Sequence, residues 1–500
     1  MDYNEALRYI SGFSDFEKKT GYTYSAETFD LRRPRALLAF MGNPQLRFPS
    51  IVVAGTKGKG STCAMIASIL QTSGRRIGLY TQPHLHTFRE RIRVEGRLIS
   101  PREMAEAVEA VIPAVERLER DRPELGPPTT YEVATAAAMY FFARQALDLA
   151  VLEVGLGGRL DAVNVVDPLL SVLTPISLDH IQILGNSIAQ IAAEKAGIIK
   201  ENGVVVSAEQ PEEAMAVIQQ VALERGARLM VVRAAGNGHE AREDGETGRR
   251  GDAETPGHGD SELASSPPHG GEGPGAGSVD STHYSSLITH HFSAHPRQER
   301  AEIALRGPSG EVYRTELPLL GAHQVANAAT AIAVVEQLGR VGFPVGRAAV
   351  EQGLASVQWP GRLEILSRQP LVVVDGAHNG DSAHKLADAL RESFIYRRLI
   401  LILGTSTDKD VPGIIAALAP VASVVIATRS RHARAADPER LAAEARKLCS
   451  RVEVAHDLPT ALGVATALAA PSDLVCVTGS LFTVADAREQ FGLATETDGG

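Results

Sequence analysis

The chain has 500 residues, of which 44% are hydrophobic and 22% charged, and its formal net charge is −10 at pH 7. This length allows two or three domains, and the composition is that of a folded globular protein rather than a disordered or fibrous one. An acidic chain is not expected to attract nucleic acid or an anionic membrane. Three cysteines without a C-x-x-C pair exclude a disulfide framework and a thiolate zinc site.

The N-terminal sequence is polar and acidic, without the basic and apolar regions of a signal peptide. No stretch approaches 18 uninterrupted apolar residues, which is the length that a membrane-spanning helix needs. Both observations, together with the low cysteine count, predict a soluble protein of the reducing cytoplasm.

Short apolar runs rich in leucine and β-branched residues recur along the chain, and helical patterns separate them. Runs that do not alternate with polar residues are typical of parallel strands buried on both faces. They lie at 51–53, 149–154, 170–173, 371–374, 399–403, 424–427 and 474–478. Helices are predicted at 61–72, at 131–147 behind a Thr130 cap, and from a capping box of Ser187 and Gln190 to Gly197. The predicted fold class is therefore α/β.

Two shifts in composition divide the chain. Residues 236–280 contain 12 of the 46 glycines, no aromatic residue and only two large aliphatic residues, Leu263 and Val279. Such a segment cannot bury enough apolar surface to offset the entropy lost on ordering, so we predict a disordered insertion at about 235–298. The turn-rich segment 359–362 is the second shift, and it predicts a boundary between domains 1–361 and 362–500.

A glycine-rich loop follows the first apolar run and precedes a helix, and in this context backbone N–H groups can cradle phosphates. It reads Gly55-Thr56-Lys57-Gly58-Lys59-Gly60-Ser61, with a spacing shorter than that of the common P-loop. Lys59 would supply a positive charge to the outer phosphates, and Ser61 or Thr62 could reach phosphate or magnesium. A glycine turn that merely packs helix on strand would leave Lys59 unexplained.

Three further polar residues stand near the predicted strands. Glu153 is flanked by apolar residues, where a carboxylate is costly unless it is paired or binds a cation, and this suggests a magnesium ligand. His180 follows the third run, and Lys195 comes fifteen residues later at a predicted helix end. Taken singly, His180 could be a hydrogen-bonded structural histidine and Lys195 a solvated cation at a helix end.

Four segments occur in a characteristic order: the phosphate loop, L-E-V-G-L-G-G-R-L-D-A-V-N at 152–164, L-D-H at 178–180 and E-K-A-G-I-I-K at 194–200. In this order they resemble the folylpolyglutamate synthase and dihydrofolate synthase family of the Mur ligase superfamily. The resemblance runs from residue 52 to about 482, apart from the insertion. It implies an ATP-dependent carboxylate–amine ligase with a large P-loop-type ATPase domain, whose sheet is mainly parallel, and a smaller Rossmann-like C-terminal domain that closes over the site.

The resemblance also implies roles for individual residues. The ATP site would contain Gly58, Lys59, Gly60, Ser61, Asn327, Arg362 and Asp375. Ligands for two magnesium ions would be Glu153, His180, Gln82 and, if it is carbamylated, Lys195. The pterin-side pocket would include Thr129, Tyr131, Asp161 and Ala162, and the glutamate subsite would include His378 and Ser480. Lys59, Lys195 and His180 would act in catalysis, and a monovalent cation is a further candidate cofactor.

The sequence departs from the family's pattern at two positions. Gln82 stands where the family has a serine that ligates magnesium, and its amide oxygen is a ligand that magnesium accepts. Lys57 replaces an asparagine in the phosphate loop, and its cation could strengthen phosphate binding or point to solvent. Carbamylation of Lys195 needs a neutral amine, so a pKa lowered by burial or by neighbouring cations would favour it.

The implied chemistry is attack of a carboxylate on the γ-phosphate of ATP, followed by displacement of phosphate by the amine of L-glutamate. The acceptor would be dihydropteroate, a reduced folate or both. A bifunctional enzyme is the first expectation, and an enzyme of polyglutamylation alone is the second. The alternatives outside this family are a Mur-type ligase acting on another carboxylate and a non-catalytic nucleotide-binding regulator. The resemblance also implies a monomer.

Overall fold

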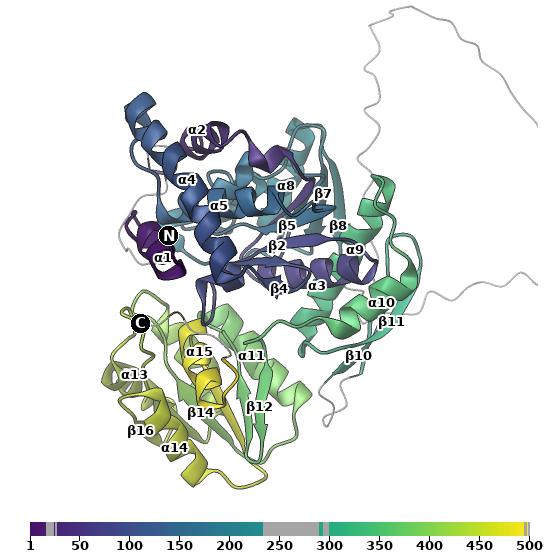
Figure 1. Ribbon diagram of the computed structural model, residues 1–500. Coiled ribbons are helices and arrows are strands. Elements are labelled where there is room, and N and C mark those ends of the chain that lie inside the picture. Colours follow the sequence, from purple (N-terminus) through teal and green to yellow (C-terminus); the bar gives the residue numbers. More distant parts are fainter. Residues whose placement is uncertain (17–24, 26–27, 234–289, 294–299, 495–497, 499–500) are drawn as a thin grey trace, which may run out of the picture.

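The computed structural model describes residues 1–500 apart from 17–24, 26–27, 234–289, 294–299, 495–497 and 499–500. The chain forms a large domain that ends near residue 360 and a small domain built from the remainder, which lies below it in Figure 1. In the described part of the chain, no helix is both long and apolar enough to span a bilayer.

An eight-stranded sheet forms the centre of the large domain, in the order β4-β3-β2-β5-β1-β6-β7-β8. Neighbours from β2 to β8 are parallel, and β3 and β4 extend one edge in antiparallel pairing. The strands are β1 (Ser50–Ala54), β2 (Ile77–Tyr80), β3 (Ile92–Val94), β4 (Arg97–Leu98), β5 (Leu149–Glu153), β6 (Leu170–Leu173), β7 (Val204–Ala208) and β8 (Arg228–Val232). The central strands β1 and β5 are buried along their whole length, as parallel strands covered on both faces must be.

Helices cover both faces of this sheet and bury its apolar side chains in two clusters. One face carries α1 (Tyr3–Ser11), α2 (Arg32–Phe40), α4 (Pro101–Asp121), α5 (Thr130–Ala143), α7 (Ile188–Ala196) and α8 (Glu212–Glu224). The other face carries α3 (Lys59–Thr72), α9 (Ala322–Arg340) and α10 (Arg347–Ser356), next to a sheet of β9 (His290–Ser293), β10 (Ala301–Arg306) and β11 (Val312–Leu317). Short helices are α6 (Ile181–Leu184), η1 (Pro44–Leu46), η2 (Phe88–Arg91), η3 (Pro123–Leu125) and η4 (Ala162–Val165).

The small domain is a six-stranded sheet in the order β12-β13-β17-β14-β15-β16, parallel except for the edge strand β12. Its strands are β12 (Glu364–Arg368), β13 (Leu371–Val374), β14 (Leu399–Leu403), β15 (Val424–Ala427), β16 (Val452–Val454) and β17 (Leu474–Thr478). One face packs on α11 (Gly380–Ser393), α12 (Val411–Leu418) and α13 (Pro438–Ala445), and the other on α14 (Leu458–Leu468) and α15 (Leu481–Gln490); η5 (Ala419–Val421) follows α12.

The predicted α/β class is confirmed, and all seven apolar runs are strands. Three local predictions were wrong in detail. Thr129, not Thr130, caps α5. Ser187 caps α7, but the side chain of Gln190 accepts from the N–H of Asn186 instead of closing a box on Ser187. Most of the predicted disordered insertion lies outside the described residues, but 290–293 within it form the strand β9, because they pair with β10.

Candidate functional site

A cavity of about 1960 Å³ lies where the two domains face each other. The large domain contributes the loops after β1, β5 and β6, which are neighbours in the sheet, and the small domain contributes the loops after β13, β14 and β17. Ligand sites of open α/β sheets form at these carboxyl ends of the strands. Every residue named above as a candidate for the ATP, metal, pterin or glutamate site lines this one cavity.

The phosphate loop turns sharply from β1 into α3. Gly55 and Gly58 have φ values of +149° and +81°, and a Cβ atom at Gly58 would come within 2.3 Å of Asn327 Oδ1. Asn327, on α9, therefore lies directly against the phosphate loop at Gly58. The Nζ atom of Lys59 lies 3.3 Å from the carbonyl oxygen of Gly55, so the lysine curls back over the loop at the N-terminus of α3. Free N–H groups at a helix start and a nearby ammonium favour an anion at this point.

Two oxygen donors for a cation meet beside this loop. Glu153, at the end of β5, is 3% exposed, and in the described part of the chain it forms no ion pair. Burial raises the pKa of its carboxyl, although Lys59 nearby opposes this shift. The backbone N–H of Gln82 donates to Glu153 Oε2 at 3.1 Å, and Gln82 Oε1 is buried without a hydrogen-bond partner among the described residues.

These donors fit magnesium. An orphaned amide oxygen beside a buried carboxylate offers hard oxygen ligands, and magnesium in nucleotide sites takes one or two protein ligands and completes its shell with water and phosphate oxygens. The described residues contain no cluster of three or more histidine, cysteine or acidic side chains arranged for a metal. Magnesium held by Glu153 and Gln82 would share its coordination with the phosphates of a nucleotide, as magnesium in nucleotide sites does.

Lys195 is buried, not solvated, so that alternative is wrong. Its Nζ donates to the carbonyl oxygen of Gly55 at 2.8 Å, and its side chain lies at the end of α7 inside the domain. Burial and the nearby charge of Lys59 lower the pKa of Lys195 to about 7. A substantial neutral fraction at physiological pH is the condition that carbamylation requires.

His180 and Lys57 both lie beside Asp179, in the loop after β6. The side chain of His180 is 40% exposed to the cavity, and its Nε2 is 3.9 Å from Asp179 Oδ1. The Nζ atom of Lys57 forms an ion pair of 2.8 Å with Asp179 Oδ2 and is 15% exposed, so Lys57 does not point to solvent. Although burial opposes it, His378 and the charge of Lys57 hold the pKa of the Asp179 carboxyl well below its usual range.

The residues predicted for the pterin side form one hydrogen-bonded group. The hydroxyl of Tyr131 donates to Asp161 Oδ1 at 3.0 Å and accepts from Gln82 Nε2 at 2.7 Å. Asp161 also accepts from three backbone N–H groups, yet burial raises the pKa of its carboxyl to about 6. Thr129 is the buried cap of α5, and Ala162 is buried beside Asp161. This group is continuous with the metal-site candidate Gln82.

On the small-domain side, the side chains of candidate residues accept hydrogen bonds from nearby backbone N–H groups. Asp375 accepts from the N–H groups of Leu363 and Ala377, both at 2.9 Å, and burial raises the pKa of its carboxyl. Arg362 lies next to it, since a Cβ atom at Gly376 would come within 2.4 Å of the Arg362 guanidinium. Ser480 is 6% exposed and caps α15.

Sequence reasoning missed two residues that shape the cleft. Asp179 lies within the L-D-H segment and Asn379 directly follows His378, but neither had a predicted role; Asn379 Nδ2 donates to Asp179 Oδ2 across the domain boundary at 3.2 Å. The available signal was a polar pair following a buried strand in each domain, because such positions face the cleft. That the two pairs meet could not be seen without the packing of the domains.

The family models of two Mur ligase domains match this chain. Residues 53–243 match the Mur ligase middle domain, and residues 361–481 match the glutamate ligase domain of Mur ligases. The dihydrofolate synthase/folylpolyglutamate synthase of Bacillus subtilis is 33% identical over 98% of this chain and 99% of its own length. The chain belongs to the folylpolyglutamate synthase/dihydrofolate synthase family.

Other folylpolyglutamate synthase family members agree with this assignment. The structure of Mycobacterium tuberculosis folylpolyglutamate synthase complexed with ADP has a TM-score of 0.80 and 31% identity, with 99% of both chains covered. A probable bifunctional folylpolyglutamate synthase/dihydropteroate synthase of Haloferax volcanii is 34% identical over 98% of this chain. This chain spans about half the length of that relative.

Proposed function

We propose that this chain is an ATP-dependent ligase that joins L-glutamate, through its amine, to the carboxyl group of dihydropteroate and of reduced folates. The observation that carries the proposal is the single cavity in which Lys59, Lys195 and Glu153 meet the small domain. The relatives' names and the ADP complex of the mycobacterial structure support it. The proposed unit is a large ATP-binding domain, 1–361, and a small glutamate-ligase domain, 362–500.

In the first step, the acceptor carboxylate would attack the γ-phosphorus of ATP to give an acyl phosphate and ADP. Gly58, Gly60 and Ser61 would hold the phosphates through the loop and the start of α3, and Lys59 would offset charge on the transferred group. Asn327, Arg362 and Asp375 would complete the nucleotide site. Magnesium, when bound, would supply charge neutralisation at the phosphates, and Glu153 with Gln82 would hold it. His180 and a carbamylated Lys195 would provide a second metal position.

In the second step, the amine of glutamate attacks the acyl carbon, the C–N bond forms, and phosphate leaves. Thr129, Tyr131, Asp161 and Ala162 would border the pterin side, with His378 and Ser480 on the glutamate side. The small domain covers the cleft, and this would protect the acyl phosphate from water. Bifunctionality is the finer part of the proposal, with the joint name of the Bacillus relative in its support. We further infer a cytoplasmic monomer without nucleic-acid or membrane partners, a state that light scattering after size exclusion would test.

The deciding experiment measures ADP release by the purified protein with ATP, magnesium and glutamate, in parallel with dihydropteroate and with tetrahydrofolate, and identifies the products by mass. Glutamate addition to both acceptors supports the bifunctional enzyme. Addition to the folate alone reduces the function to polyglutamylation. Release with neither acceptor would contradict the proposal and favour another Mur-type substrate.

A further inference from the structure

One carboxylate connects the two domains directly beside the phosphate loop. Asp179 accepts from Lys57 Nζ at 2.8 Å and from Asn379 Nδ2 at 3.2 Å through the same oxygen, Oδ2. Lys57 belongs to the phosphate loop of the large domain, whereas Asn379 precedes α11 of the small domain. The carboxylate is 11% exposed, so the contact is shielded from water, where such interactions are stronger than at the surface.

The small-domain end of this contact is rigid. The Oδ1 atom of Asn379 accepts from the N–H of Ser382 at 3.0 Å as the cap of α11, which leaves Nδ2 for Asp179. His378 is fixed beside it, because its Nδ1 lies 2.8 Å from the carbonyl oxygen of Gly376 while its Nε2 is 3.7 Å from Asp179. A shift of α11 away from the large domain would therefore break the contact at once.

Lys57 supplies the positive charge that this arrangement needs. A shielded carboxylate is costly unless it is paired, and within the described ranges Lys57 forms no ion pair except that with Asp179. Asparagine, which the family pattern has at this position, could donate a hydrogen bond but not a charge. With Lys57 at this position, the phosphate loop of this chain forms an ion pair with Asp179 that an asparagine could not form.

We propose that Lys57, Asp179 and Asn379 form a latch that holds the small domain closed over the phosphate loop, with Lys57 as a positioning residue that acts through Asp179. This rests on the ligase function proposed above. Closure decides which nucleophile reaches the acyl phosphate. The amine forms the C–N bond and releases phosphate, whereas water regenerates the carboxylate and releases the same phosphate. A weakened latch therefore turns ATP into ADP and phosphate without amide.

Two variants test the latch from opposite sides. Lys57→Asn removes the charged end, and Asn379→Ser keeps a good helix cap but is too short to reach Asp179. Both variants should raise the ratio of ADP released to amide formed. The rise should be about tenfold for Lys57→Asn, since a charged donor typically binds a carboxylate more strongly than a neutral donor by about this factor. Lys57→Arg should restore a ratio near that of the wild type.

Lys447→Asn is the matched control, because it makes the same substitution in an ion pair with Glu444 that lies within the small domain and away from the cleft. Its ratio should equal that of the wild type. If Lys57 instead contacted the phosphates of ATP directly, Lys57→Asn would raise the KM for ATP and Asn379→Ser would change nothing. That pattern would overturn the latch.

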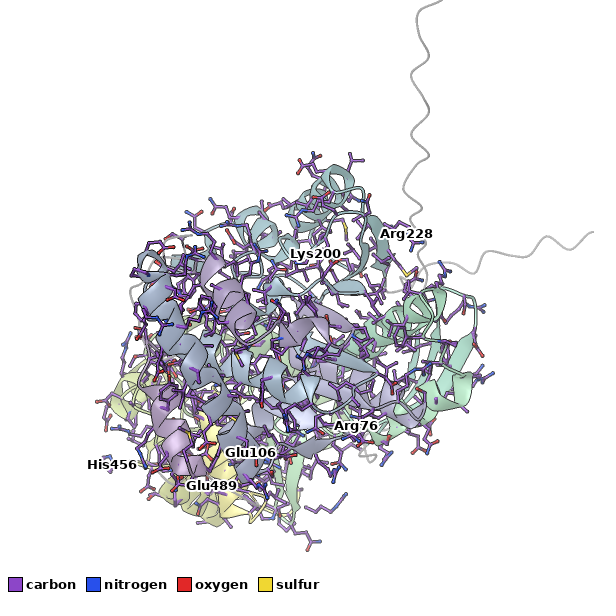
Figure 2. All side chains as sticks on the ribbon, turned by 45° about the horizontal axis from the view of Figure 1, so that its top comes forward. Arg76, Glu106, Lys200, Arg228, His456 and Glu489 are labelled. Atoms are coloured by element: carbon purple, nitrogen blue, oxygen red, sulfur yellow. The ribbon has the colours of Figure 1, made fainter. Side chains whose placement is uncertain are left out.

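A distance measurement tests the latch without any turnover. Figure 2 shows Glu106 on the large domain and His456 on the small domain, both exposed, whereas the three natural cysteines are buried. Fluorophores on Glu106→Cys and His456→Cys should report a longer mean distance in Lys57→Asn and Asn379→Ser than in the wild type, with a non-hydrolysable ATP analogue and magnesium present. Equal distances in all three proteins would refute the latch. A longer distance in a protein that ligates neither acceptor would keep the latch and reject the ligase.

Discussion

The two walls of the cleft each carry buried polar residues, but four of these residues differ in how their polar atoms are satisfied. On the large-domain wall, among the described residues, Glu153 is buried without an ion pair and Lys195 donates to a carbonyl oxygen alone. On the small-domain wall, Asp375 accepts two backbone N–H groups and Ser480 caps a helix. Glu153 and Lys195 are therefore left electrostatically incomplete, whereas Asp375 and Ser480 are satisfied by nearby backbone groups.

We interpret this difference as a division between residues that act on ligands and residues that stabilise loops. Buried charges without partners cost stability, and they are retained where a ligand completes them. Saturated polar groups cost nothing of this kind and fix loops instead. Substitutions of Lys59 and Glu153 should therefore reduce activity while leaving or improving stability, and substitution of Asp375 should reduce stability first.

The largest effect is expected for Lys59→Ala. Lys59 is proposed to supply charge to the phosphates. Within the part of the chain that the structure describes, it donates to the carbonyl oxygen of Gly55 alone, at 3.3 Å, so the fold loses little when it is removed. Turnover of ATP should fall by roughly 10²–10³-fold or more, as it does when one preorganised electrostatic donor is lost. Steady-state ADP release checks this, with the melting temperature as the control for folding. Turnover close to that of the wild type would remove Lys59 from the site.

Glu153→Gln should separate the two properties most clearly. Burial raises the pKa of this carboxyl, so the neutral amide of the same shape relieves a cost in the folded state. The free energy of unfolding should stay the same or rise by about 1 kcal/mol, while magnesium-dependent turnover falls by about a hundredfold. Urea unfolding and a magnesium titration of turnover measure both. A strong loss of stability would show that Glu153 is structural.

The strands that could be predicted are those whose burial on both faces is evident from an uninterrupted run of apolar residues. Both faces of β6 and β14 are covered, and their apolar runs have the same bounds in sequence and structure. The antiparallel strands β10 and β11 were not predicted, because their sequences, AEIALR and VYRTEL, neither form an apolar run nor alternate strictly between apolar and polar residues. The strand β9 depends on its pairing with β10, which sequence composition does not reveal.

The predicted site residues all line one cavity, but their electrostatic surroundings could not be predicted. Lys195 stood at a helix end, where a solvated cation is ordinary, and only the packing of α7 against the phosphate loop shows it buried on Gly55. The sequence did not decide whether Lys57 contacts phosphate or solvent. Its partner in the structure is Asp179, which lies 122 residues further along the chain. Such partners depend on how loops and helices far apart in the sequence pack within the large domain, which local sequence patterns do not encode.

Asp375→Asn tests the small-domain wall. The carboxylate holds the N–H groups of Leu363 and Ala377 with separate oxygens, and an amide offers only one acceptor oxygen. One buried N–H is then unsatisfied, which should cost about 2 kcal/mol of the free energy of unfolding. Urea unfolding of the variant checks this, with Ser480→Thr, which keeps the helix cap, as the comparison. A variant as stable as the wild type would contradict the idea that this wall is structural.

The smallest expected effect concerns His323, which lies where the two walls meet. Its ring is packed near Gly321 and near Ala389 of α11, and burial, with the charge of Lys385, lowers the pKa of His323 to about 4. Because the folded pKa is below the unfolded value of about 6.5, the unfolded chain binds the proton more readily. The stability from this group is therefore present above pH 6.5 and is lost as the pH falls towards 4.

Between pH 7 and 5.5 this should lower the free energy of unfolding by about 1 kcal/mol, and His323→Gln should lack that part of the pH dependence. Because the packing that buries the ring involves α11, a separated small domain would return the pKa of His323 towards its ordinary value. Urea unfolding of both proteins at the two pH values measures the difference. An identical pH dependence in the variant would mean that His323 is not buried between the two domains in solution.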